Sequence, residues 1–277
     1  MLGRRVVTAL VLLAILLPAI FVFPPLVWGV ITLAFLAVGA WEWARLLPAR
    51  GGAAPSGWPA VAAVLVAGAG ALAWRQQAEW PAPAVPVVCL LLLGFWVFAA
   101  PRRLGRHEAR GGGGLLAAAL LFGCWLALYE LRLLGPVPLL SSMAVIWVAD
   151  IAAYFFGRAL GRRKLAPSIS PGKSWEGAVG GFFAVAVIGL LAAAMPALRD
   201  SLPALLVQQA GPVLAVVALV AIAALSIVGD LHESLLKREA GVKDSGWILP
   251  GHGGVLDRID ALIPTMPAAL LLYELLR

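Results

Sequence analysis

Long apolar runs separated by short polar connections follow one another along almost the whole sequence. Each run has about the length, roughly 20 residues, that an α-helix needs to cross the hydrocarbon core of a bilayer. Nine runs fit this description, at 6–23, 26–47, 58–74, 84–100, 115–134, 139–156, 178–195, 212–229 and 261–276. The pattern predicts an all-α fold, a polytopic integral membrane helical bundle with about nine transmembrane helices.

The first apolar run begins directly after Arg4 and Arg5, which is also how a secretory signal peptide begins. No small-residue cleavage site follows it, and Pro24 and Pro25 lead straight into the next run. We therefore predict that this run is retained as a membrane span. The chain is expected to form a single membrane unit over 1–277, with N-terminal helices in 1–110 and the functional loops in 111–277.

Lysine and arginine are divided unevenly between alternate connections. Of the 21 basic residues, all but four fall on one side of the nine-span arrangement. The four exceptions are Arg75, Arg132, Arg199 and Arg277. Cytoplasmic loops of membrane proteins carry the excess of Lys and Arg. The charge pattern thus predicts that the basic loops, including Arg50 and the functional loops, face the cytoplasm and that the C-terminus faces out. We expect the membrane to be a bacterial-type cytoplasmic (inner) membrane.

Composition argues against nucleic-acid binding by the basic residues and against a disulfide or metal site at the cysteines. Hydrophobic residues make up 62% of the sequence and the net charge is +7, but the arginines flank apolar runs. Anionic lipid headgroups and membrane orientation explain this charge better than nucleic acid does. Cys89 and Cys124 lie inside apolar runs, as small buried hydrophobic residues do, and no disulfide or metal pair is expected from them.

The most polar part of the sequence is the stretch 230–260, which follows the eighth run. It gathers carboxylates, basic side chains and five glycines. Carboxylates hold hard cations such as Mg²⁺, basic side chains neutralise phosphoryl oxygens, and glycines let backbone N–H groups approach an anion. This stretch is therefore the candidate metal and phosphate site.

Spacing within this stretch places its polar residues on helix faces. A helix ending at Gly241 would carry Asp230, Glu233, Ser234 and Lys237 on one face. Asp257 and Asp260, three residues apart, would share a face at the start of the last span, where anions are favoured. The alternatives are an amphipathic surface helix and, for the aspartates, simple helix caps.

Two further motifs lie upstream. Asp150 lies inside the sixth run, where a carboxylate indicates a functional polar cavity unless it pairs with a residue such as Arg158. Tyr154 lies one helical turn further, on the same face. The Gly-Lys-Ser of 172–174 is not a P-loop, because position 167 is proline instead of the required glycine and no βαβ unit surrounds it. Lys173 could instead contact phosphate or lie solvated at the membrane interface.

The order and spacing of these motifs resemble the phosphatidate cytidylyltransferases (CDP-diacylglycerol synthases). The C-terminal signature of that family is matched at Ser234, Lys237, Arg238, Lys243, Asp244, Pro250, His252, Gly253, Gly254, Asp257, Arg258 and Asp260. Its upstream motifs are matched at Asp150, Ala153, Tyr154, Gly157, Arg158, Ser170, Pro171, Lys173, Ser174, Glu176 and Gly177. Gly172 stands where the family usually has its first lysine.

The resemblance implies that the phosphate of phosphatidic acid attacks the α-phosphorus of CTP, giving CDP-diacylglycerol and pyrophosphate. It implies Mg²⁺, with K⁺ as a second cation, and a homodimer. We predict metal ligands at Asp230, Asp257 and Asp260. Catalytic roles are predicted for Asp230, Asp257, Lys237, Arg238, Lys243 and Arg258, and substrate binding for Lys173, Ser174, Ser234, His252, Gly253, Gly254, Asp150 and Tyr154.

Two other functions compete with this one. A transporter or flippase could use an intramembrane aspartate and an anion-binding loop, but transporters show internal repeats and broken midplane helices, and no repeat is evident. A cytidylyltransferase for another lipid, such as an isoprenoid ether phosphate, would share the signature. Outside the motifs, we expect Glu42 at the membrane interface with Trp41 and Trp43 as belt residues.

Overall fold

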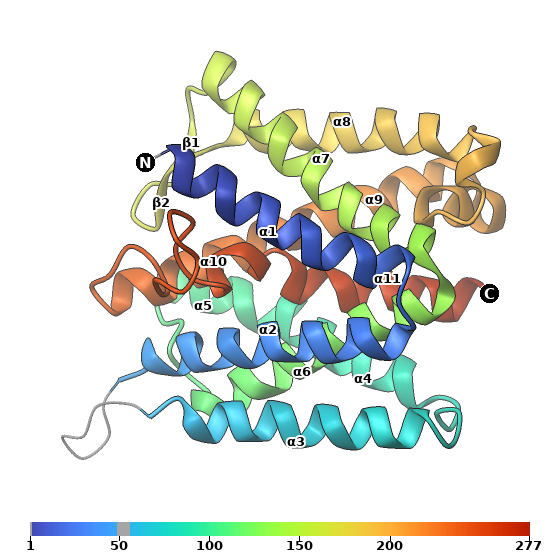
Figure 1. Ribbon diagram of the computed structural model, residues 1–277. Helices are drawn as coiled ribbons and strands as arrows, with labels where there is room; N and C mark the ends of the chain where they lie inside the picture. The colour runs from blue at the N-terminus through green and yellow to red at the C-terminus, as the bar shows by residue number, and fades with distance from the viewer. Residues whose placement is uncertain (1, 49–55) are drawn as a thin grey trace.

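A computed structural model gives the fold of residues 2–48 and 56–277, with side chains described from residue 6 onward. Arg50, part of the predicted basic side, lies outside these ranges, as do the side chains of Arg4 and Arg5. The described chain is mostly helical (Figure 1). The helices are α1 (Leu2–Phe21), α2 (Pro25–Arg45), α3 (Trp58–Arg75), α4 (Ala84–Gly94), η1 (Phe95–Ala99), α5 (Ala100–Arg106), α6 (Gly113–Leu134), α7 (Pro136–Leu160), α8 (Trp175–Ala193), η2 (Pro196–Leu198), α9 (Leu202–Glu239), α10 (Leu256–Ile259) and α11 (Leu262–Leu276).

The predicted class, an all-α polytopic membrane bundle, is confirmed. Within the described residues, 8 helical segments are long and apolar enough to cross a membrane, and the shorter apolar helix Val6–Phe21 accounts for the remaining predicted span. The predicted eighth span, 212–229, is only the middle of α9. Gly211, with φ of 80°, interrupts α9 just before that span, and the helix then continues through Glu239.

Polar connections collect at one end of the bundle. Figure 1 places the N-terminus, α5, the β1–β2 hairpin and α10 at this end and the C-terminus at the other. These are the connections to which the charge pattern assigned the basic excess. The alternation of the predicted connections is therefore confirmed for the described residues, while the side of the membrane on which this end lies stays a prediction.

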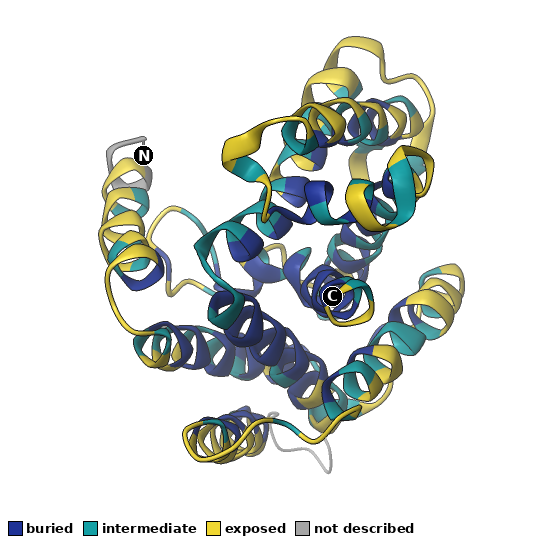
Figure 2. Cartoon of the chain, turned by 90° about the vertical axis from the view of Figure 1, so that its right-hand side faces the viewer, coloured by how far each residue is buried: buried dark blue, intermediate teal, exposed yellow. Residues whose placement is uncertain are grey.

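Two groups of helices enclose α11. One group consists of α2, α3 and α6, and the other of α7, α8 and α9, while α11 contacts α4, α6, α7 and α9. Figure 2 shows α11 buried near the centre and the outer faces of the surrounding helices exposed, as expected where lipid covers them. Close packing of α7 on α8 depends on Gly177 and Gly181, because a Cβ at either would lie within 3 Å of a carbonyl oxygen of α7.

A short antiparallel hairpin joins α7 to α8. Its strands are β1 (Lys164–Ala166) and β2 (Ser170–Ser174), with Lys164 opposite Ser174. Ser174 also caps α8, since its Oγ accepts the N–H of Gly177 at 3.2 Å. The Glu176 carboxylate accepts the backbone N–H groups of Arg162 and Arg163, so the start of α8 fixes the hairpin in place.

Candidate functional site

A pocket of about 900 Å³ lies at the polar end of the bundle, between α7, the β1–β2 hairpin, α9 and the start of α11. Its lining brings together three motifs that are far apart in the sequence. The predicted site residues in its wall are Asp150, Tyr154, Lys173, Ser174, Asp230, Asp257, Arg258 and Asp260. The loop 157–177 and the stretch 230–260 therefore converge on one pocket.

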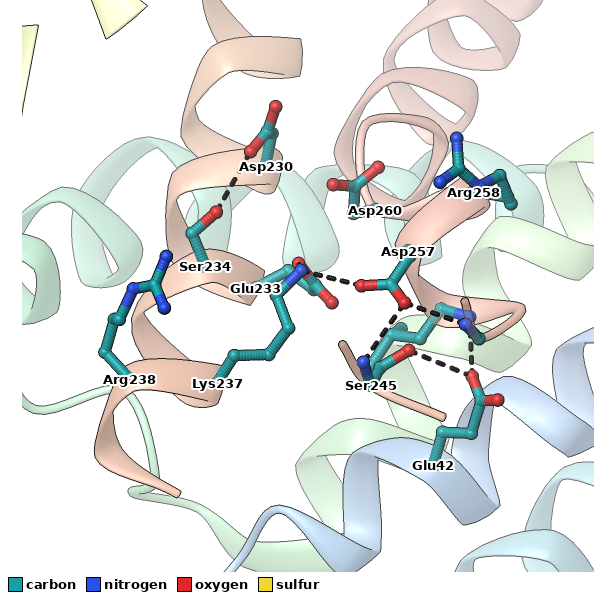
Figure 3. Close-up of polar contacts among 12 residues, drawn as sticks. Glu42, Asp230, Glu233, Ser234, Lys237, Arg238, Ser245, Asp257, Arg258 and Asp260 are labelled. Carbon is teal, nitrogen blue, oxygen red and sulfur yellow. Dashed lines mark hydrogen bonds and ion pairs between the residues drawn. The ribbon is translucent and has the colours of Figure 1, made fainter. Parts of the chain in front are cut away.

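One ion pair joins the hairpin to α9 within this pocket. The Lys173 Nζ lies 2.6 Å from Asp230 Oδ2. The other oxygen of Asp230 accepts the hydroxyl of Ser234 at 3.2 Å, one turn further along α9 (Figure 3). Both Lys173 and Asp230 stay partly exposed, with side chains 25% and 35% accessible. This pair is therefore open to a ligand that enters the pocket.

Lys237 lies deeper, between two carboxylates. Its Nζ lies 2.6 Å from Asp257 Oδ1 and 2.5 Å from Glu233 Oε2. The predicted helical face holding Asp230, Glu233, Ser234 and Lys237 is confirmed, because α9 runs through all four. Glu233 is almost fully buried and pairs with Lys237, and removing one partner of a buried ion pair costs about 3–5 kcal/mol. Lys237 therefore stabilises the acidic cluster and has no free charge to offer a substrate without breaking these pairs.

Asp257 organises the loop before α10. Its Oδ2 accepts the backbone N–H of Gly254 at 2.8 Å and of Ser245 at 3.1 Å, while its Oδ1 takes Lys237. Gly253 has φ of +84°, and a Cβ there would lie 2.7 Å from Asp257 Oδ2. Every oxygen of this carboxylate is thus engaged by protein donors, and glycine is needed beside it.

A second carboxylate, Glu42 of α2, holds the same loop from the other side. Its Oε2 accepts the N–H of Leu256 at 2.7 Å and the hydroxyl of Ser245 at 3.2 Å (Figure 3). A Cβ on Gly246 or Gly254 would collide with the Glu42 carboxylate. Glu42 is fully buried, so its side chain lies inside the protein and does not face the membrane surface, while its depth at the membrane interface stays a prediction. A carboxylate within an apolar run, the same signal that identified Asp150, could have revealed it.

The expectation for the neighbouring tryptophans is also corrected in part. Trp43 is buried, and its ring lies 5.6 Å from that of His232, which is itself fully buried. Phe95 and Trp96 pack on the same imidazole. Trp43 is thus part of an aromatic cluster around His232 of α9 and is not a membrane-belt residue. Trp41 instead lies near Trp247 of the loop, with Arg45 over its ring.

Several predicted site residues lie outside the pocket wall in the described structure. They are Ser234, Lys237, Arg238, Lys243, His252, Gly253 and Gly254. Arg238 donates to the carbonyl of Ile169 at 3.3 Å and so reinforces the contact between hairpin and α9. Lys243 is exposed. His252 offers its carbonyl to Arg258, whose Nε and Nη2 donate at 3.1 and 2.8 Å. This loop geometry orients Arg258 at the pocket rim.

Asp150 does not have the purely structural partner considered for it. Arg158 donates to the hydroxyl of Tyr154 at 3.2 Å, and no ion pair of Asp150 occurs within the described residues. Both Asp150 and Tyr154 line the pocket. The geometry therefore leaves the Asp150 carboxylate facing the space that a ligand would occupy.

The oxygen-rich lining fits a hard cation better than zinc. Among the described residues, no three His, Cys, Asp or Glu side chains are grouped closely enough to hold a metal by themselves. Mg²⁺ is commonly bound by one or two carboxylates together with water and substrate phosphates. Asp230 and Asp260 line the same pocket and suit that role (Figure 3). The Mg²⁺ and K⁺ assignments stay predictions.

Comparison with known proteins covers nearly the whole chain. The sequence model of the cytidylyltransferase family matches residues 3–276. A phosphatidate cytidylyltransferase from Pseudomonas aeruginosa is 40% identical over 98% of this chain and 97% of the relative. Proteins of the same name from Brucella suis and Haemophilus influenzae are 44% and 46% identical, over 66% and 47% of this chain and 64% and 43% of the relatives. With a family match from end to end and a pocket built from that signature, the chain belongs to the cytidylyltransferase family.

Proposed function

We propose that this protein is a phosphatidate cytidylyltransferase, which forms CDP-diacylglycerol and pyrophosphate from CTP and phosphatidic acid. The observation that carries the proposal is the pocket in which Lys173, Asp230 and Asp260 meet at the polar end of a membrane bundle. The similarity to relatives of that name over nearly the whole chain supports the same reaction.

The reaction needs charge control more than a strong base. The phosphate monoester of phosphatidic acid is already an oxyanion near neutral pH. One of its oxygens bonds to the α-phosphorus of CTP while the bond to the β-phosphate oxygen breaks, and pyrophosphate leaves with that electron pair. Two anions must therefore be held together and the charge of the leaving group neutralised. Arg158, Lys173 and Arg258 are the basic motif residues that line the pocket.

The acidic residues in the pocket require additional positive charge before phosphates can bind. Asp150, Asp230, Asp257 and Asp260 balance Arg158, Lys164, Lys173 and Arg258 in the lining. We infer that Asp230 and Asp260 hold Mg²⁺ together with substrate oxygens, and that K⁺ is a second cation. When bound, these cations would neutralise phosphate oxygens. Asp257 then acts through Lys237 and the loop that it orders.

The pocket also has an apolar side. Ile146 and Trp147 of α7 and Leu262 of α11 line it together with the charged residues. Phosphatidic acid would approach along this side from the bilayer, and CTP from the aqueous end. We infer that this end faces the cytoplasm in the inner membrane and that the protein forms a homodimer. On a background without Cys89 and Cys124, an impermeant thiol reagent should label Ser168→Cys only from the cytoplasm and Asp200→Cys only from outside, while crosslinking should reveal a dimer.

Purified protein given CTP, phosphatidic acid and Mg²⁺ should release pyrophosphate and CDP-diacylglycerol in equal amounts. ATP in place of CTP should give far less product, and omission of Mg²⁺ should stop the reaction. An isoprenoid ether phosphate offered in competition separates the two lipid classes. Folded protein that moves phosphatidic acid across vesicles without releasing pyrophosphate would support the transporter instead.

A further inference from the structure

A second pocket, of about 590 Å³, lies beside α5 and shares no lining residue with the active-site pocket. Its lining is dominated by basic side chains and consists of Arg102, Arg103, Arg106, His107, Glu108, Arg110, Gly111 and Glu239. Four guanidinium groups face two carboxylates, so the pocket carries excess positive charge even with a neutral imidazole. It belongs to the polar end of the bundle, where α5 ends the membrane-spanning segment Ala84–Arg106.

Two of the arginines are held in place by the protein. Arg103 donates to the carbonyl of Gly111 at 2.7 Å and lies 5.1 Å from the centre of the Phe95 ring. The backbone N–H of Arg110 donates to Glu239 Oε2 at 3.2 Å, but its side-chain Nε lies 3.9 Å from the same oxygen. This buried Nε has no hydrogen-bond partner among the described residues. Glu239 thus holds Arg110 by an ion pair, while the Arg110 side chain keeps 26% of its accessible surface for a ligand.

The other two arginines have no partner within the part of the chain that the structure describes. Arg102 and Arg106 are exposed, and neither forms an ion pair or hydrogen bond within 2–48 or 56–277. They lie four residues apart on α5, so they share one helix face, where like charges repel and destabilise the helix. A bound anion would turn this repulsion into attraction.

An apolar pocket of about 650 Å³ adjoins the basic one and shares Arg110 and Gly111 with it. Its other walls include Ala44 of α2, Ala60 of α3 and Leu115 of α6. The basic and the apolar pocket are thus neighbours at the polar end of the bundle. A ligand that fills both must combine a negatively charged headgroup with an acyl chain.

We propose that these two adjoining pockets bind an anionic phospholipid at a site separate from the substrate site. Its phosphate contacts the guanidinium groups of Arg102, Arg106 and Arg110, and one acyl chain lies in the apolar pocket beside Ala60 and Leu115. Inorganic phosphate could satisfy only the basic half. The apolar half favours the lipid, and the inference does not depend on which reaction the active site performs.

Native mass spectrometry of the purified protein tests this site with phosphatidylglycerol and phosphatidylcholine of identical acyl chains. Wild-type protein should retain phosphatidylglycerol preferentially. Arg102→Gln combined with Arg106→Gln should weaken this binding at least about tenfold, as expected for lost charge-assisted contacts. Arg162→Gln combined with Arg163→Gln is the matched control, because it removes the same charge from exposed residues at the same end and should leave binding unchanged.

Three outcomes would overturn the proposal. Equal loss in both double variants would mean general attraction between a basic surface and lipid. No loss in either would place phosphatidylglycerol elsewhere, including the active-site pocket. Displacement of the lipid by an equal concentration of inorganic phosphate would indicate a free-anion site. Size-exclusion profiles of both variants confirm that they remain folded, and all four substituted side chains are exposed.

Discussion

Asp230 and Asp257 occupy the same pocket but have opposite surroundings. Asp230 meets one lysine and one hydroxyl, and its side chain keeps 35% of its accessible surface. Asp257 accepts two backbone N–H groups and the ammonium of Lys237, and its side chain is 7% accessible. The same residue type from one signature therefore does two things: Asp230 is open to a ligand, while Asp257 holds the protein around that ligand.

This difference explains why a pattern of acids and bases overstates the number of ligand-binding groups. A buried carboxylate is tolerated only when donors surround it. Such donors, here Lys237 and the N–H of Gly254, belong to the signature as well. Part of the signature therefore exists to position the rest.

The largest effect is expected from Asp230→Asn. The amide keeps the shape and removes the charge that faces the ligand, so turnover should fall about a hundred- to a thousandfold, as for other lost electrostatic groups. Stability should change by less than about 1 kcal/mol, since the ion pair with Lys173 is partly exposed. Steady-state rates across a range of Mg²⁺ concentrations and thermal unfolding in detergent measure the two quantities.

Ser234→Ala is the control for that variant. It removes the hydrogen bond to Asp230 and leaves every charge in place, so its loss of activity should be about tenfold or less. Asp230→Asn with activity within tenfold of wild type would contradict an open, ligand-facing Asp230.

Asp257→Asn should reduce stability more than Asp230→Asn does. It should reduce activity indirectly, through the loop that Asp257 orders. The substitution leaves Lys237 and two N–H groups around a neutral amide, and disrupting such a buried pair costs about 3–5 kcal/mol. Lower thermal stability should accompany faster amide hydrogen exchange across 240–255. If stability and exchange stay normal while the activity loss fails to add to that of Asp230→Asn, both aspartates bind one metal ion and the contrast between them disappears.

The sequence predicted the site correctly where residue chemistry and helical spacing indicate the same arrangement. Helical periodicity correctly placed Asp230, Glu233, Ser234 and Lys237 on one face, and the cost of intramembrane charge correctly identified Asp150 as facing a polar space. Which donors each carboxylate receives could not be predicted, because they come from loops and helices distant in sequence. Ser245 reaches across 203 positions to Glu42, and no local period encodes such a contact.

The substitution Glu42→Gln tests that long-range support. The neutral amide can still accept one hydrogen bond, but the charge-assisted contacts to Leu256 and Ser245 weaken, so stability should fall by about 1–3 kcal/mol. Turnover should fall about tenfold with little change in the KM for CTP, since no contact to the pocket itself is lost. Unchanged exchange of 240–255 together with a raised KM would instead make Glu42 part of the CTP site.

The smallest effect is expected from Lys243→Ala, even though Lys243 belongs to the signature. Its side chain is exposed in the turn after α9 and lies outside the pocket wall. A single exposed charge contributes about 0–1 kcal/mol, so the KM for CTP should rise less than about threefold to fivefold. Lys173→Ala is the comparison, because the Lys173 ammonium lies inside the pocket against Asp230. It should raise the KM for CTP at least about tenfold, as lost charge-assisted contacts do. Should the two variants raise that KM equally, the loop 241–255 must close over bound CTP and bring Lys243 to its phosphates. The size of the effect of each signature variant would then depend on the conformation of this loop in the CTP-bound protein, and not on which residues line the pocket.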